Sequence, residues 1–315
     1  MAAAAGLLVG AAIVRHFDVQ AVFAAVRPIG IGGFLLVLLA QAALSLPLGL
    51  AWWIVALQPT RRLAVFAWTS LVAEAAEALL PFAQIGAAAI ASRAAVIVGV
   101  EAPVAVASNV VDITLELAAQ LIYTLSGAVL LADRLQGDGA APLNAAVWSG
   151  LGLLAALVAG LLVAQKWGLA VLGWMLRRIA PAHPGSRRTT EAIAGLYRRP
   201  RRLVACLALH IAAWFASAGA TWLILALIGR PLPLWRTAAL ESLMLAVRNV
   251  AFFVPAGLGV QEGAYVVLGP QFGLPPHAAL ALSLLKRSRD VALGIPVLIS
   301  WQAMEIRRPL RRRRG

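Results

Sequence analysis

Charged residues recur at helical spacing inside stretches of this sequence that are otherwise apolar. The stretch from residue 241 to 290 contains Glu241, Arg248, Glu262 and Asp290. A charged side chain near the centre of a bilayer costs from about 3 to about 10 kcal/mol or more, so such residues are expected to pair with one another or to line a wet cavity. The chemistry that they offer is the binding of a charged or zwitterionic head group, or of a coupling proton.

Helix breakers interrupt the same stretch. Pro255, Gly257 and Gly259 follow one another closely, and irregular backbone at membrane depth is tolerated only inside protein or beside a cavity. We therefore predict a re-entrant hairpin over residues 236 to 270. Glu262 stands at the start of its short second helix, where free N–H groups and the helix dipole stabilise a carboxylate. We expect Glu262 to have a direct role in transport, and a simple helix cap is the alternative.

Residues 62 to 98 repeat this pattern. Glu74 and Glu77 share one helix face, Pro81 ends the helix, and a second short helix carries Arg93. The helix predicted next, over residues 103 to 132, has a polar stripe that should face the bundle interior and the later helices. Its members are Asn109, Asp112, Glu116 and Gln120. We expect Asp112 or Glu116 to lie near Lys286 or Arg287.

Composition identifies the broad class. Of 315 residues, 62% are hydrophobic and only 13% are charged, with a mean hydropathy of +0.86, which is typical of a polytopic membrane protein. The net charge of +14 is concentrated in residues 166 to 202 and in the C-terminal tail, without interleaved stacking aromatics, so it indicates positive-inside topology and no nucleic acid. The single Cys206 and four scattered histidines predict no disulfide, metal site or cofactor.

The elements that position these charges form a single all-α membrane domain over residues 1 to 315. We predict about six spanning helices, at residues 1–14, 30–57, 103–132, 144–164, 203–228 and 277–300, plus the two re-entrant hairpins. Residues 30–132 form a first repeat unit, 144–164 a connecting helix and 203–300 a second unit. The loop at 133–143, which is poor in cations, should be external, and both termini should be cytoplasmic. With this topology the second unit is inverted relative to the first in the membrane. A fixed offset of 174 residues pairs Pro81 with Pro255 and Gly99 with Gly273.

The two units carry complementary charges. The membrane portion of the first has five acidic residues and one basic, and that of the second has four basic and three acidic. Ion pairs between the units would either lock the bundle or bind a head group, and the alternative is that Lys286, Arg287 and Arg289 snorkel to an interface or only set helix register. The candidate substrate-binding and transport residues are Glu74, Glu77, Arg93, Asp112, Glu116, Glu241, Arg248, Pro255, Gly257, Gly259, Glu262, Lys286, Arg287 and Asp290.

Two motifs resemble those of a known family. The segment VPAGLGVQEG (254–263), followed by LLKRSRD, resembles the membrane domain of the lysylphosphatidylglycerol synthase (MprF) family, and LPFAQIGAAAIASR resembles its first-half counterpart, with Gln84 and Ala87 in place of the more usual Gly and Glu. The residues of the second-half motif, VPAGLGVQEG, and the Trp301–Glu305 ending look most like the hopanoid-biosynthesis-associated HpnL branch. The resemblance implies lipid translocation between leaflets. We expect no soluble aminoacyl-transferase domain after the last helix, and therefore no enzyme.

Three functions are compatible with these features. The first is a lipid flippase of the bacterial inner membrane that moves a phospholipid or hopanoid-type lipid, with anionic head groups at the basic loop and tail. The second is a non-transporting partner of lipid-biosynthetic enzymes. The third, a membrane-embedded lipid transferase, is disfavoured because no phosphate-cradling Gly-rich loop occurs.

Overall fold

The computed structural model describes residues 27–56, 63–80, 83–131, 184–250 and 260–312, together with 148–149, 152, 155–156 and 159–160. Regular structure in these ranges is helical throughout, so the predicted all-α membrane protein is confirmed. The predicted span over residues 1–14, most of 144–164, and Pro81, Pro255, Gly257 and Gly259 lie outside the described residues.

The first half of the described chain has two long helices that flank two short ones. A 3-10 turn, η1 (Arg27–Ile29), leads into α3 (Gly30–Ala56), which is followed by α4 (Leu63–Leu79), α5 (Ala83–Ile97) and α6 (Ala102–Leu131). These bounds agree closely with the predicted span, hairpin and span. α3 continues through Pro47.

The second half repeats this order after one additional helix. That helix is α9 (Pro184–Tyr197), and α10 (Pro200–Leu227), α11 (Leu234–Val250), α12 (Val260–Leu268), the 3-10 turn η5 (Gly269–Phe272) and α13 (Pro276–Arg312) follow. Two predictions were wrong here. The basic segment at 166–202 is predicted to be a loop, but residues 184–197 within it are helical, because Pro184 suits a first helical position and Ile193 and Leu196 are buried against the rest of the protein. The last helix runs to Arg312 rather than ending near residue 300.

The two hairpins end in the same way, at the two glycines that the offset of 174 pairs. Gly99 has φ +95° and Gly273 has φ +87°, in the left-handed region that favours glycine. In each case the glycine N–H bonds to the carbonyl three residues back, and the next N–H bonds to the carbonyl five residues back. This pair of bonds closes a helix C-terminus and turns the chain into the following long helix.

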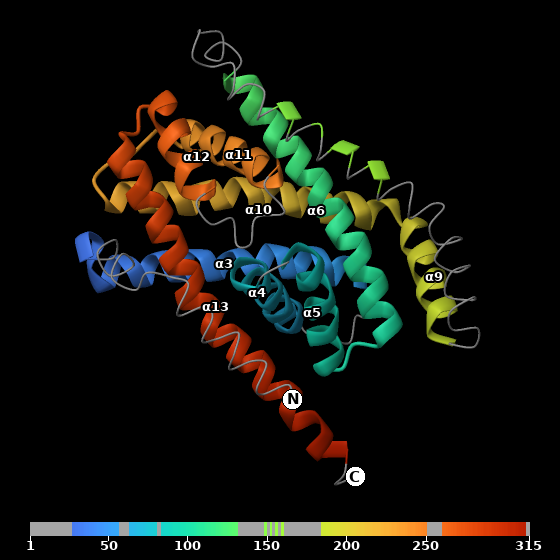
Figure 1. Cartoon of the computed structure of the whole chain (residues 1–315). Helices are drawn as coiled ribbons and strands as arrows, with labels where there is room; N and C mark the ends of the chain where they lie inside the picture. The colour runs from blue at the N-terminus through green and yellow to red at the C-terminus, as the bar shows by residue number, and fades with distance from the viewer. Residues whose placement is uncertain are drawn as a thin grey trace.

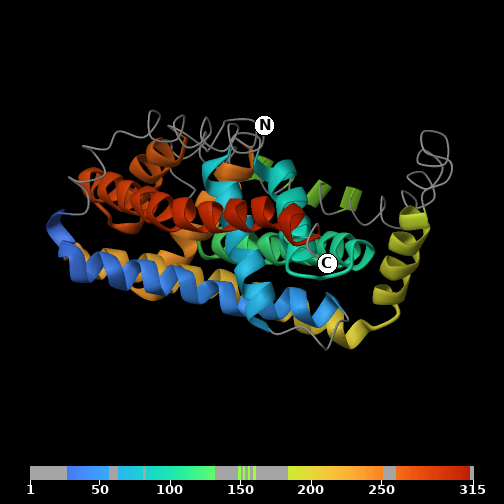
Figure 2. The same cartoon turned by 90° about the horizontal axis from the view of Figure 1, so that it is seen from below.

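The first helices of the two halves lie side by side and antiparallel (Figure 1). Near one end, a Cβ added at Gly33 on α3 would lie 3.5 Å from Leu227 on α10. At the other end, Arg202 of α10 donates a hydrogen bond of 3.1 Å to the carbonyl of Ile54 on α3. In Figure 2 this pair runs along the lower edge of the molecule, and α13 runs above it.

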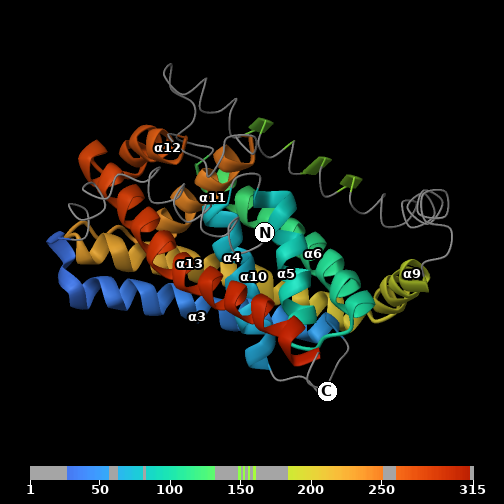
Figure 3. The same cartoon turned by 60° about the horizontal axis from the view of Figure 1, so that its bottom comes forward.

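Each half packs its last helix on the hairpin of the other half. α6 contacts α11, and α13 contacts α4, so both contacts cross between the halves. Figure 3 shows α13 passing over α4, and it shows α9 at the edge of the molecule next to α6. Each of the two buried apolar clusters is built mainly by one half and also includes residues of the other, so the cores of the halves are joined.

Three of the described helices are long and apolar enough to cross a membrane: α3, α6 over Ala102–Ala128, and α10. Their outer faces expose large apolar side chains, among them Ile31, Leu39 and Val204. Because lipid is an apolar solvent, such faces are expected of helices that contact a bilayer. α13 is longer still, but four charged residues lie together at 286–287 and 289–290 in its first half.

Candidate functional site

An open cleft lies between the two halves, where α13 passes α3 and α4. Its cavity volume is about 30 Å³, room for a small polar group. Its polar residues are Gln41, Glu74 and Asp290, and its walls are made by apolar side chains and one glycine. The wall residues are Leu71, Ala75, Ala78, Leu293, Gly294 and Val297. Two of the predicted transport residues, Glu74 of the first half and Asp290 of the second, therefore share one cleft.

Glu74 has one carboxylate oxygen that is satisfied and one that is open. Gln41 donates a hydrogen bond of 3.2 Å to Oε2. Oε1 is buried and has no hydrogen-bond partner in the described part of the chain. A buried acceptor without a partner costs about 1–3 kcal/mol, so a ligand that donates to Oε1 would gain this amount.

Asp290 is held by its neighbour in sequence. Nε and Nη2 of Arg289 donate hydrogen bonds of 2.9 and 2.7 Å to Oδ1. Arg289 also interacts electrostatically with Glu74, so one guanidinium lies within the field of both carboxylates. The cleft thus combines apolar walls with an acceptor for a donor group, an arrangement that suits an amphiphile with a cationic or hydrogen-bonding head.

The charges of the second half pair largely among themselves. Lys286 of α13 forms an ion pair with Glu241 of α11, and Arg287 contacts Oε1 of Glu262 with Nε at 2.7 Å. Glu262 lies in the first turn of α12, as predicted, so a carboxylate at a helix start also neutralises an arginine. Its direct role in transport stays a prediction.

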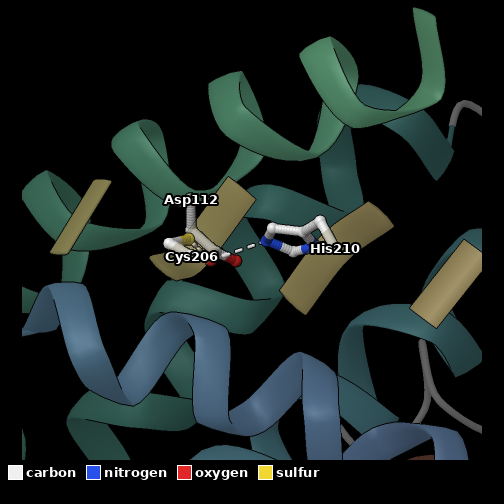
Figure 4. Close-up of side chains that lie close together, drawn as sticks. All are labelled: Asp112, Cys206 and His210. Atoms are coloured by element: carbon white, nitrogen blue, oxygen red, sulfur yellow. Dashed lines mark hydrogen bonds and ion pairs between the residues drawn. The ribbon is translucent and has the colours of Figure 1, made fainter. Parts of the chain in front are cut away.

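The polar stripe of α6 faces the second half at Asp112, as predicted, but Asp112 meets α10 there. Asp112 lies 3.0 Å from Nε2 of His210 and 3.4 Å from Sγ of Cys206, both on α10 (Figure 4). Asn109, one turn earlier, donates to the carbonyl of Ala88 at 2.7 Å. We expected Asp112 or Glu116 near Lys286 or Arg287. For Asp112 this was wrong, because Lys286 and Arg287 are neutralised by Glu241 and Glu262 of their own half.

Sequence reasoning missed Cys206 and His210. Both were assigned no role because neither has a second histidine or cysteine in a familiar metal-binding motif. Their spacing of four residues is nevertheless the signal that places two side chains on one helix face. That face of α10 meets Asp112, whose position in the polar stripe indicated that it would be buried.

Two ion pairs join the halves at the surface. Arg248 of α11 lies 3.5 Å from Glu77 of α4, with both side chains about half exposed. Arg93 of α5 pairs with Glu305 of α13. All seven charged residues of the stretch from 241 to 290 therefore have an ion-pair partner, as the cost of burying charge led us to expect.

The long apolar helices and the buried charges at helix contacts define an α-helical membrane protein. Comparison with protein families matches residues 1–297 to the lysylphosphatidylglycerol synthase TM region. The chain belongs to this family, which associates it with membrane lipids. No curated protein and no solved structure shows significant similarity to it.

Proposed function

We propose that this protein is a transporter that moves a polar lipid between the leaflets of the bacterial inner membrane, and that it performs no covalent chemistry. The observation that carries the proposal is the cleft at Glu74 and Asp290. It opens between the two halves, its walls suit acyl chains, and the open oxygen Oε1 of Glu74 suits a donor on the head group.

The packing of the halves supports this function. The antiparallel contact of α3 with α10 and the exchanged contacts of α6 and α13 are those expected of an inverted repeat. A site between two such halves can face either side of the membrane in turn when one half moves against the other. The units at 30–132 and 203–300 would be these halves.

Lipid retention tests the role of Glu74 in binding. We expect native mass spectrometry of the detergent-purified protein to show bound lipid with an amine head group, and Glu74→Gln to reduce its occupancy by about tenfold, because one charge-assisted hydrogen bond is worth about 1.5 kcal/mol or more. Glu101→Gln is the matched control, since Glu101 is exposed at the start of α6 and far from the lining residues in sequence. Equal retention by Glu74→Gln would remove this residue from the binding site.

Three finer assignments belong to the same proposal. The hopanoid-associated branch makes a hopanoid-type lipid a substrate to be tested beside phospholipids, and lipid-biosynthetic enzymes are the corresponding protein partners. The exposed basic residues around the start of α10 would bind anionic head groups at the cytoplasmic surface, each contributing about 1 kcal/mol. These are Arg198, Arg199, Arg201 and Arg202. Both termini would then be cytoplasmic.

A further inference from the structure

Three metal-ligating side chains converge in the interior, away from the cleft. Asp112 comes from α6, and Cys206 and His210 come from successive turns of α10. Figure 4 shows the thiol and the imidazole directed toward the same carboxylate. Their ligand atoms all lie within 4.8 Å of one another, and all three residues are buried.

The contacts meet at a single oxygen. Nε2 of His210 lies 3.0 Å, and Sγ of Cys206 3.4 Å, from Oδ1 of Asp112. A nitrogen lone pair and a carboxylate oxygen repel at this distance unless a proton or a metal cation lies between them. Nδ1 of His210 has no hydrogen-bond partner among the described residues, so Asp112 is the only described hydrogen-bond partner of the ring.

The surroundings favour a cation at this point. Glu116 lies one turn beyond Asp112 on α6 and interacts electrostatically with Asp112, His210 and Cys206. The rest of the shell is apolar, since Cys206 belongs to the buried cluster that includes Ala107 and Val111. A dry shell with excess negative charge strengthens the binding of a cation and excludes competing water.

We propose that Asp112, Cys206 and His210 bind a divalent ion of the zinc class, which fastens α6 of the first half to α10 of the second. Sulfur, nitrogen and carboxylate oxygen are the ligands that Zn²⁺ takes in proteins, and in a tetrahedral site they lie about 3.3–3.8 Å apart. Here Nε2 and Sγ lie 3.0 and 3.4 Å from Oδ1 of Asp112, so a small adjustment would admit the ion. Binding displaces the thiol proton, and any proton shared by the imidazole and the carboxylate, to solvent.

The site would fix one contact between the halves while the cleft contacts change. Because the ligands occupy α6 and α10, the ion would leave the contact of α13 with α4 free to move. This inference does not depend on lipid transport, since a metal can join two helices in a protein of either function.

Metal binding by the purified protein tests the proposal directly. The full chain, purified without a histidine tag and treated with chelator, is dialysed against Zn²⁺ and analysed by inductively coupled plasma mass spectrometry. We expect one zinc per chain for the wild type and none for Cys206→Ala or His210→Gln. His277→Gln is the matched control, because His277 is exposed at the start of α13 and its loss should leave the stoichiometry unchanged.

Cobalt provides a readout that does not depend on variants. Co²⁺ bound to wild-type protein should show the visible bands of a tetrahedral ion and a sulfur-to-cobalt charge-transfer band in the near ultraviolet. Absence of zinc from wild-type protein, a cobalt spectrum without the sulfur band, or full zinc retention by Cys206→Ala would each overturn the proposal. In that event the three groups would form a hydrogen-bonded triad and nothing more.

Discussion

Lys286 has all three of its ammonium donors satisfied inside the second half. It pairs with Glu241, and it donates to the hydroxyl groups of Tyr265 at 2.7 Å and Thr221 at 3.3 Å. Tyr265 in turn donates to Glu241. Four helices contribute to this network, since Thr221 lies on α10, Glu241 on α11, Tyr265 on α12 and Lys286 on α13. The network therefore fixes how the second half is assembled.

Removing the charge of Lys286 alone should lower the free energy of unfolding more than removing the charges of both Lys286 and Glu241. We expect Lys286→Met alone to lower the free energy of unfolding by about 3–5 kcal/mol, because it leaves Glu241 buried without a counter-charge. The double variant Lys286→Met with Glu241→Gln should recover most of this loss. Thermal unfolding in detergent measures the cycle, and additive losses would show that the two residues are not coupled.

The pair of Arg93 with Glu305 is the control at the surface. The two side chains are 48% and 24% exposed, so solvent screens their attraction. We expect Arg93→Gln to change stability by no more than about 1 kcal/mol. A loss as large as that of Lys286→Met would mean that this contact between α5 and α13 is essential to the packing of the halves.

At the residue scale, the sequence indicated which charges would be buried but not their partners. Helical spacing places Asp112 and Glu116 on one face whatever that face meets. Which helix it meets depends on the tertiary packing, and complementary charge alone could not distinguish Lys286 from His210. The cleft was only partly predictable: Glu74 and Asp290 were named, but Gln41 was not, because a single amide in an apolar helix has no distinctive pattern.

At the scale of secondary-structure elements, the close contact of α3 with α4 depends on a glycine. A Cβ added at Gly49 of α3 would lie 2.5 Å from the Cα of Ala67 and 2.8 Å from the carbonyl carbon of Phe66, which are backbone atoms of α4. Backbone cannot rotate away as a side chain can, so the two helices would have to separate. By contrast, a Cβ at Gly219 of α10 would meet nothing within 4 Å.

These two glycines predict opposite effects of the same substitution. We expect Gly49→Ala to lower stability by about 1–3 kcal/mol through overpacking. We expect Gly219→Ala to be neutral or to raise stability by up to about 1 kcal/mol, because alanine favours the helix. Melting temperatures of the two variants in one detergent provide the comparison. A melting temperature of Gly49→Ala at or above the wild-type value would exclude the close approach of α3 and α4.

The helices themselves were largely predictable because long apolar runs end at Pro and Gly. α9 was missed because nine basic residues between 166 and 202, with Pro184, Gly185 and Ser186 among them, suggested a loop. Its helix is stabilised by the packing of Ile193 and Leu196, a tertiary effect that a local pattern does not show. The extension of α13 to Arg312 likewise places Glu305 beside Arg93, far away in sequence.

The whole molecule has the symmetry of an inverted repeat only if the two hairpins face opposite sides of the membrane. This orientation predicts that reporter fusions after Gly139, in the predicted external loop, and after Gly185, at the start of α9, give opposite readings. The reason is the single crossing expected between them and the concentration of positive charge after residue 166. Equal readings at the two sites would contradict the inverted arrangement.

Movement of lipid through the cleft is the central claim, and reconstitution tests it most directly. The protein is placed in vesicles of phosphatidylethanolamine and phosphatidylglycerol that contain an acyl-labelled fluorescent phosphatidylethanolamine, and an impermeant reductant bleaches the outer leaflet. A transporter exposes the inner-leaflet probe, so bleaching should proceed beyond the half reached in protein-free vesicles. We predict that nearly all of the probe is bleached in vesicles with wild-type protein or with Glu101→Gln. With Glu74→Gln at equal incorporation, bleaching of the probe that starts in the inner leaflet should be about tenfold slower or more, because the head group loses its hydrogen-bond acceptor. Bleaching that stops at half with well-folded wild-type protein would contradict the account and favour a non-transporting partner of lipid-biosynthetic enzymes.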